Sequence, residues 1–309
     1  MNTSPDLLAD SQSRLETTVQ VTISPARRFY WSVRRELWEN RSVYLAPVAV
    51  GAVSLIGFFI STVHLPAKIR AASALEPMQQ HAAIGQPFVI VALMLMFAEI
   101  VVAVFYSLDA LYGERRDRSV LFWKSLPVSD SMVVLSKASI PILVLPLVTF
   151  AVTVATQFVM LVVGSAVLAG NGMDGATLWK HVPFFQTAGI NLYHLVVFHG
   201  IWYAPFYGWL LMVSAWAKRT PFLWAVLPPA AIGVVEKIAF NTSHFSMMLL
   251  YRFMGGPRPG KAGGFMTMDM LAPDHPGQIF ISPGFWIGLA ITAGFLFAAV
   301  RLRRSRAAA

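Results

Sequence analysis

The chain has 309 residues, of which 56% are hydrophobic and only 13% are charged, and it carries a formal net charge of +9 without a single cysteine. Soluble globular domains carry about 25% charged residues, so this composition excludes an ordinary soluble domain and is typical of a membrane protein. The lack of cysteine excludes a disulfide framework and thiol chemistry. The basic residues lie beside apolar segments, a position that favours contact with anionic lipid over binding of nucleic acid.

Six apolar segments are long enough to cross a membrane, since about 20 helical residues span its hydrocarbon core. They lie at 45–63, 87–111, 138–168, 190–216, 220–240 and 283–301. The fifth segment is the least regular, because Pro228 and Pro229 lie inside it. The polar N-terminus shows no signal-peptide pattern. We therefore expect an all-α membrane protein with six transmembrane helices.

The distribution of lysine and arginine predicts the orientation of these spans, because cytoplasmic segments next to a membrane are enriched in both residues. Most of them lie in segments that would share one side: 14–41, 115–137, 218–219 and 301–306. This bias places both termini in the cytoplasm and makes 241–282 the largest outer segment. We expect one transmembrane domain, 24–302, followed by a basic cytoplasmic tail, 303–309.

The polar residues 1–23 are expected to form a mobile cytoplasmic tail, followed by a helix over residues 24–40. Ser24 and Pro25 are typical of a helix start, a capping hydroxyl followed by proline at the first helical position. The helix has an apolar stripe, a charged back and aromatic edges, which favours a helix lying in the membrane interface. The alternative is a cytoplasmic helix that packs on a partner.

The third apolar segment belongs to a helical pattern that is too long for a simple span. The pattern runs from Ser131 to Ala169 with Pro141 and Pro146 inside it. At about 1.5 Å per residue, such a helix exceeds a hydrocarbon core of roughly 30 Å. We expect it either to project into the cytoplasm or to tilt and bend at its prolines.

Glu99, Tyr106 and Asp109 recur along the second span at spacings that place them on one helical face. A carboxylate in the middle of a membrane is unfavourable unless it faces protein or water, so Glu99 should point into the bundle. Two interpretations stay open: a substrate or ion pathway formed by these residues, or a structural hydrogen bond from Glu99 to a neighbouring helix. Asp109 lies nearer the cytoplasmic end and also fits an interfacial residue.

The sequence shows no catalytic or metal-binding constellation, so we expect neither an enzyme nor a metal site. The segment GGPRPGKA, 255–262, is similar to the start of a phosphate-binding loop but ends in Ala262, where a hydroxyl residue should ligate magnesium. His194 and His199 are five residues apart, a spacing that does not place them on one face of an α-helix. The methionine-rich stretch 266–270 fits packing on lipid or a neighbouring subunit better than a copper site.

Residues 113–126 are predicted to form a short cytoplasmic helix that ends before Pro127. Mixed charges come first and apolar anchors follow: Glu114, Arg115, Arg116, Asp117, Arg118, Leu121, Phe122, Trp123 and Lys124. Exposed aromatic anchors with a charged rim are typical of a protein-docking surface. The alternative, a juxtamembrane loop with its basic residues on lipid head groups, explains the charges but not the two aromatic residues.

The segment ERRDRSVLFWKSLPVSDSMVVLSK, 114–137, resembles the signature of ABC-2 type transporter permeases. The match consists of Glu114-Arg115, Ser119, the run Ser125-Leu126-Pro127-Val128-Ser129, and Lys137. Where relatives often have Gly-Thr, this chain has Arg118-Ser119. The outline of the whole chain is also similar to that family: a helix before the first span, six spans, and a large outer segment before the last span.

This resemblance implies a permease homodimer in the bacterial inner membrane that docks two ATP-binding cassette subunits through a coupling helix, 113–126. The helix at 24–40 would be the elbow helix of that family. ATP and Mg²⁺ would bind to the partner subunits, and this chain would need no cofactor of its own. Closure of the partners on ATP would push the coupling helices, and the resemblance implies export of an amphipathic, peptide or lipid-like substrate.

Two alternatives come from other functional classes. A proton-coupled secondary transporter would use Glu99 as its proton site, but many such transporters are built from inverted repeats, and the two halves of this chain show no internal similarity. A non-transporting membrane scaffold or sensor would recruit a cytoplasmic protein through residues 113–126. A neighbouring gene for an ATPase with a complete phosphate-binding loop would favour the transporter.

Overall fold

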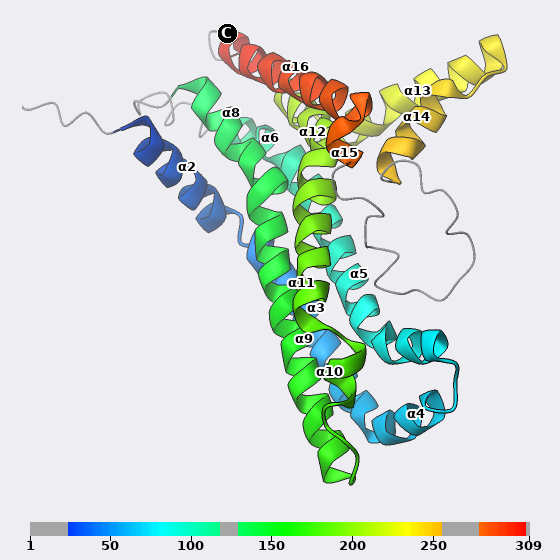
Figure 1. Cartoon of the computed structure of the whole chain (residues 1–309). Coiled ribbons are helices and arrows are strands. Elements are labelled where there is room, and N and C mark those ends of the chain that lie inside the picture. Colours follow the sequence, from blue (N-terminus) through cyan, green and yellow to red (C-terminus); the bar gives the residue numbers. More distant parts are fainter. Residues whose placement is uncertain (1–23, 118–128, 255–277, 307–309) are drawn as a thin grey trace, which may run out of the picture.

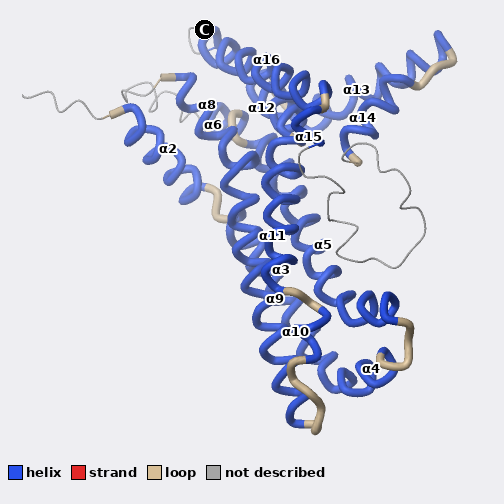
Figure 2. The backbone as a smooth tube through the Cα atoms, viewed as in Figure 1, coloured by secondary structure: helices blue, strands red, loops and turns tan. Residues whose placement is uncertain are grey.

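The computed structural model describes residues 24–117, 129–254 and 278–306, and these ranges are helical, without a strand. Figure 1 shows the helices in chain order, and Figure 2 shows the loops between them. Within these ranges, five helices are long and apolar enough to cross a membrane, and up to six if the bent pair Phe184–Trp202 and Ala204–Trp216 is one span. The prediction of an all-helical chain with several membrane-spanning segments is confirmed at this level.

In chain order the helical segments are α2 (Pro25–Glu39), α3 (Ser42–Ser61), η1 (Thr62–His64), α4 (Leu65–Ala72), α5 (Pro77–Asp109), α6 (Tyr112–Arg116), α8 (Asp130–Ser139), η2 (Ile140–Val144), α9 (Leu145–Gly170), α10 (Thr177–His181), α11 (Phe184–Tyr193), η3 (His194–Trp202), α12 (Ala204–Trp216), α13 (Pro221–Phe240), α14 (His244–Phe253), α15 (Gln278–Ile281) and α16 (Pro283–Arg306). The segments η2 and η3 are π-helical. The predicted apolar segments all fall on these helices or on consecutive helical segments. Helix α6 covers the start of the predicted 113–126 helix, of which residues 118–126 lie outside the described part.

The long helices α3, α5 and α9 pack against one another and, with α11, form the elongated part of the molecule (Figure 1). A buried apolar cluster holds them together, and in it Leu95, Met160 and Leu161 are shielded from solvent. Large apolar side chains on the outer faces, such as Phe97 and Phe105 of α5, are exposed. Helices that are apolar on both packed and exposed faces are typical of membrane spans.

The overlong third helix is interrupted by a wider helical turn. Helices α8, η2 and α9 run on from Asp130 to Gly170, and Pro141 lies at the start of the π-helical η2. Proline has no N–H and its ring clashes with the carbonyl group four residues earlier in an α-helix. The π-helical hydrogen bonding of η2 accommodates this ring, so the helix changes its type at Pro141.

The second π-helical segment, η3, packs against η2 through Gly200. A Cβ atom at Gly200 would lie 2.2 Å from the carbonyl oxygen of Ile142. Glycine is therefore required for the two backbones to approach this closely. The widened parts of the third and fourth apolar helices consequently meet inside the bundle.

The fourth apolar helix bends by 45° between η3 and α12, where Pro205 removes a backbone donor. After the bend the N–H of Phe206 bonds to the carbonyl of Tyr203. The carbonyl of Trp202 instead accepts a hydrogen bond of 3.0 Å from Nε of Arg252 in α14. The Arg252 guanidinium also lies 4.0 Å from the centre of the Trp202 ring. Helix α14 is thus attached to the bend.

Helix α2 packs along α8, and its apolar stripe contributes Val33 and Leu37 to a buried cluster. As predicted, the hydroxyl of Ser24 caps its start by accepting from the N–H of Arg27 at 3.3 Å. Trp38 lies on the opposite edge and is 70% exposed. One face of α2 is therefore held by contacts with the rest of the protein. Its aromatic edge is exposed, and the position of that edge in the membrane interface stays a prediction.

Candidate functional site

Charged side chains from separate helices meet at one end of the bundle. This end, called the charged end below, holds α6, the start of α8 and the end of α16 (Figure 1). Nζ of Lys137 in α8 lies 2.9 Å from Oε1 of Glu36 in α2 and 3.0 Å from Oε1 of Glu114 in α6. The three side chains are only 3%, 8% and 10% exposed, respectively. Lys137 therefore bonds two carboxylates at once in a site from which water is almost excluded.

Arg303, near the end of α16, extends this arrangement. Its guanidinium donates to Oε2 of Glu114 through Nη1 and to Oδ1 of Asp130 through Nε, the latter at 2.9 Å. The hydroxyl of Tyr106 in α5 donates to Oε2 of Glu36 at 2.9 Å. We call these residues the charged network: Glu36, Tyr106, Glu114, Asp130, Lys137 and Arg303. Through it, α2, α6, α8 and α16 are joined by hydrogen-bonded ion pairs, and α5 is joined by the hydrogen bond of Tyr106.

Burial makes the charged network sensitive to the loss of any one member. Taking ions out of water is unfavourable, and a buried ion is tolerated where opposite charges and hydrogen bonds surround it. Removal of Lys137 would leave Glu36 without a cationic partner and would take one cation away from Glu114. A displacement of α6 would likewise separate paired charges at a place where no water can take over from the lost partner. The network therefore favours joint movement of the helices that it connects.

The predicted coupling residues divide into two groups where the structure describes them. Glu114 and Arg115 face the protein, and Arg115 donates to the carbonyl of Ala217 at 2.9 Å. Arg116 and Asp117 are exposed and form an ion pair of 3.0 Å with each other. The remaining predicted residues lie outside the described residues: Arg118, Leu121, Phe122, Trp123 and Lys124. The exposed pair is therefore the described part of the predicted docking surface that a partner could reach.

A second polar site lies inside the bundle. Glu99 in α5 is fully buried, and its Oε2 lies 3.0 Å from Nδ1 of His199 in η3. Its other oxygen, Oε1, has no hydrogen-bond partner within the described residues, and the same is true of the buried hydroxyl of Tyr207 in α12. Glu99 thus faces protein and bonds a neighbouring helix, while one of its oxygens is left unpaired. Such buried, unpaired polar atoms are rare in proteins and call for an explanation.

His194 and His199 lie together, contrary to the sequence-based inference about their spacing. Their ring centres are 6.1 Å apart, and both side chains are buried. The inference was wrong because it assumed an α-helix, whereas η3 is π-helical and brings residues five apart onto one face. Within the described residues, no group of three or more His, Cys, Asp and Glu could hold a metal ion.

The structure does not bring Glu99, Tyr106 and Asp109 into one site. Glu99 bonds His199, and Tyr106 belongs to the charged network. The carboxylate of Asp109 is exposed at the end of α5, 3.9 Å from Arg116. The three residues therefore lie in three different environments along α5, although the sequence placed them on one helical face.

Glu36 and Arg303 carry much of the charged network, yet sequence reasoning did not single them out, and it considered His199 only as a metal ligand and not as a partner of Glu99. Glu36 stands beside the apolar residue Leu37, and an acidic residue next to an apolar stripe is a weak signal of burial. Arg303 belongs to a basic cluster after the last apolar segment, where arginine usually faces lipid head groups. Nothing in the sequence shows which partners these residues have.

A comparison of the chain with family models, with curated proteins and with solved structures gives no match. Function therefore has to be inferred from the residues and from the geometry. The glycine-rich segment 255–262 and the methionine-rich stretch 266–270 lie outside the described residues.

Proposed function

We propose that this chain is the permease subunit of an ATP-driven ABC transporter of the ABC-2 type. In this proposal the charged end faces the cytoplasm of a bacterial cell, and a homodimer in the inner membrane carries two ATP-binding subunits. The partner subunits bind ATP and Mg²⁺ and hydrolyse ATP, so the chain itself is not an enzyme. The transported substrate is amphipathic, peptide or lipid-like, and the direction is export.

The observation that carries this proposal is the position of Glu114 in the charged network. Glu114 begins the segment that would contact the ATPase, and it bonds Lys137 of α8 and Arg303 of α16. Lys137 in turn bonds Glu36 of α2. A force on the coupling segment would therefore reach three helices. These are α2, which precedes the first apolar span, α8, which begins the third span, and α16, which forms the last span. This is the mechanical connection that a permease driven from outside the membrane requires.

The exposed residues beside Glu114 supply the surface for the partner. Arg116 and Asp117 present opposite charges to solvent, and complementary charges on an ATPase would fix its orientation on docking. The resemblance to ABC-2 permeases adds the aromatic anchors Phe122 and Trp123. Anchors surrounded by charges are the arrangement expected of an interface with strong binding residues.

The test separates docking from folding by avoiding the buried network. Arg116→Glu and Trp123→Ala would be introduced together, and ATP hydrolysis and transport would be measured in proteoliposomes with the neighbouring ATPase. We expect normal insertion, weaker ATPase binding and loss of transport. The matched control is Arg219→Glu, which reverses the charge of another exposed arginine, in the connection between α12 and α13. Equal transport by the double variant and the control would remove the proposed docking surface.

The pair formed by Glu99 and His199 favours one second candidate, a proton-coupled secondary transporter. Two titratable groups share a hydrogen bond of 3.0 Å in the interior of the bundle, and ionisable residues inside membrane spans often mark proton pathways. This candidate predicts uptake driven by a pH gradient without any ATPase, and loss of that uptake in Glu99→Gln. An absence of gradient-driven transport in proteoliposomes of the chain alone would exclude it.

A further inference from the structure

The outer face of α2 carries arginine and tryptophan side chains in one row. Arg27, Trp31, Arg34 and Trp38 are separated by four, three and four residues, which is the spacing of neighbours along one face of an α-helix. All four side chains are exposed. The buried residue of this helix, Glu36, stands two positions from both Arg34 and Trp38 and therefore lies on the opposite side. We call the four exposed residues the arginine–tryptophan row.

Two tryptophan rings hold the guanidinium of Arg34 in place. Its central carbon lies 5.0 Å from the centre of the Trp31 ring and 5.2 Å from the centre of the Trp38 ring. Both distances are within the range of about 6 Å over which an aromatic face attracts a cation. A guanidinium stacked on a ring keeps the N–H groups at its edge available as donors. Arg34 is therefore oriented before any ligand arrives.

The positive charge of the row has no compensating carboxylate among the residues that the structure describes. Within them, neither Arg27 nor Arg34 forms an ion pair, and the same holds for the exposed Arg41 between α2 and α3. By contrast, Arg35 on the same helix is paired with Glu39 at 2.6 Å. Complementary charge on a partner is what orients binding at such a surface, so the row fits an anionic ligand.

The row lies next to the first membrane-spanning segment. Helix α2 lies at the edge of the charged end, beside α8 (Figure 1), and only Asn40 and Arg41 separate it from α3. Helix α3 begins the first segment that is long and apolar enough to cross a membrane, and Leu45 and Val48 near its start are exposed. A bilayer around these side chains would bring its head groups to the end of α2. Tryptophan is enriched at that level of a membrane.

We propose that the arginine–tryptophan row binds the phosphate groups of anionic phospholipids at the membrane surface. Arginine can donate two parallel hydrogen bonds to a phosphate, and the indole rings beside Arg34 pack favourably among head groups. A lipid with a net negative charge is preferred over a zwitterionic one, because each basic side chain near an anionic surface strengthens binding by about fivefold. The binding does not depend on the proposed transport function, and its failure would leave that proposal intact.

Bound lipid would restrain a helix that also belongs to the charged network. The inner side of α2 contributes Glu36, which bonds Lys137 at 2.9 Å. Lipid on the outer side and Lys137 on the inner side would hold α2 between them. A ligand that binds only the folded chain raises its thermal stability, so anionic lipid should raise the Tm of the chain.

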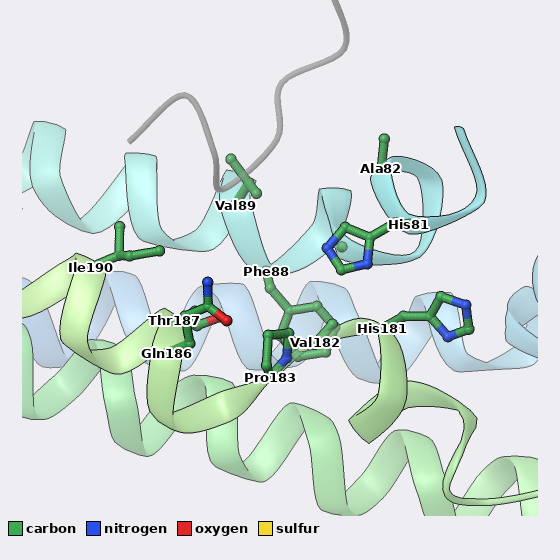
Figure 3. Close-up of a pocket in the computed structure, with 11 residues that line it drawn as sticks. His81, Ala82, Phe88, Val89, His181, Val182, Pro183, Gln186, Thr187 and Ile190 are labelled. Atoms are coloured by element: carbon green, nitrogen blue, oxygen red, sulfur yellow. The ribbon is translucent and has the colours of Figure 1, made fainter. Parts of the chain in front are cut away.

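The opposite end of the bundle supplies a matched control surface. It contains a pocket of about 270 Å³ between the start of α5 and the junction of α10 with α11 (Figure 3), and no arginine or lysine is among the residues that line it. Lys68 and Arg70 lie at this end on α4, and both are exposed. Within the described residues, neither of them stacks on an aromatic ring. They carry the same charge as Arg27 and Arg34 without the tryptophans.

The experiment compares two lipids around the full-length chain in vesicles that contain equal amounts of phosphatidylglycerol and phosphatidylcholine. One of the two lipids carries bromine, which quenches the fluorescence of nearby tryptophan. The contribution of the row is the difference between the wild type and Trp31→Phe with Trp38→Phe. We expect stronger quenching of this contribution by brominated phosphatidylglycerol than by brominated phosphatidylcholine. The preference should fall at least about fivefold in Arg27→Gln with Arg34→Gln and stay unchanged in Lys68→Gln with Arg70→Gln.

Two further measurements distinguish lipid binding from a structural role and from net charge. In detergent without lipid, Arg27→Gln with Arg34→Gln should unfold at the Tm of the wild type, because both side chains are exposed. Added phosphatidylglycerol should raise the Tm of the wild type and not that of this variant. Arg34→Lys keeps the charge but loses the planar group that stacks and bonds phosphate in parallel, so its preference should also fall.

Three results would overturn the proposal. Equal quenching by the two brominated lipids would show that the row does not select anionic lipid. A full preference in Arg34→Lys would leave no role for the stacked guanidinium. An unchanged lipid preference in Arg27→Gln with Arg34→Gln, together with loss of a bound protein from the purified chain, would assign the row to a protein partner.

Discussion

The ammonium group of Lys137 lies 2.9 Å from the carboxylate of Glu36, although 101 positions separate the two residues in the chain. Both side chains are buried, with exposures of 3% and 8%. Their contact joins the helix that precedes the first apolar span to the start of the third. With Glu114 as a second partner of Lys137, it forms the centre of the charged network on which the account of coupling depends.

Lys137→Met should strongly destabilise the chain. Methionine fills much of the same space but leaves the buried carboxylates of Glu36 and Glu114 without their shared cation. Removing one partner of a buried ion pair costs about 3–5 kcal/mol. The measurement is denaturant or thermal unfolding of the purified chain in one fixed detergent.

The control for this variant is Lys180→Met, which breaks the exposed pair of Lys180 with Asp174. Exposed ion pairs contribute about 0–1 kcal/mol, so this variant should resemble the wild type. If the two lysine variants unfolded alike, the charged network would not be a determinant of the fold.

Gly200→Ala should separate the two π-helical segments. The added methyl group would lie 2.2 Å from the Ile142 carbonyl oxygen, and a backbone atom moves away less easily than a side-chain end. Overpacking of this kind costs about 1–3 kcal/mol. Gly189→Ala is the matched control, because its methyl group would meet nothing within 4 Å; it should be neutral or stabilising by about 0.4–1 kcal/mol. A Gly200→Ala chain as stable as Gly189→Ala would contradict the close contact between η2 and η3.

Glu99 and His199 should be energetically coupled. Glu99→Leu leaves the buried imidazole without the carboxylate at 3.0 Å, and His199→Leu leaves the carboxylate without its imidazole. The unfolding free energies lost in the two single variants should therefore add up to more than the free energy lost in the double variant. The difference, the coupling energy, should be about 0.5–3 kcal/mol. A double-mutant cycle of unfolding free energies measures this quantity. Strict additivity would show that the hydrogen bond contributes nothing to the folded state.

Gly288→Ala should displace Arg252 from the bend of the fourth apolar helix. The new methyl group would lie 2.1 Å from Nη2 of Arg252, which is the end of a flexible side chain. We expect a small loss of stability and a change in the fluorescence of Trp202, because the guanidinium stacks on that ring at 4.0 Å. Gly294→Ala, with open space around the added methyl, should change neither. Trp202→Phe would identify the spectral contribution of that residue.

The apolar helices were predictable from the sequence because length and apolar composition are local properties. The sequence predicted a long third helix that projects into the cytoplasm or bends at its prolines; the structure has the long helix, with a π-helical segment at Pro141, while projection and bending stay predictions. The helix start at Ser24 followed from local hydrogen bonding and was also correct. The motif around Glu114 and Lys137 drew attention to both residues, although it could not show that they contact each other.

The two polar sites could not be assembled from the sequence, for identifiable physical reasons. Glu36 and Arg303 reach the charged network through tertiary packing, which no local pattern encodes. His194 and His199 were separated because their spacing was interpreted with α-helical geometry, and the π-helical form of η3 depends on its packing. Asp109 was grouped with Glu99 by helical periodicity, but α5 ends at Asp109 and leaves it in solvent.

The central claim is that an ATPase drives this chain through the segment that begins at Glu114, and one co-purification tests it most directly. The chain would be expressed with the ATPase from the neighbouring reading frame, purified through a tag on the chain alone, and assayed for bound ATPase and ATP hydrolysis. We expect a stable complex that hydrolyses ATP and that dissociates when Arg116→Glu and Trp123→Ala are introduced. A chain that purifies alone and stable, without binding the ATPase, would contradict the account.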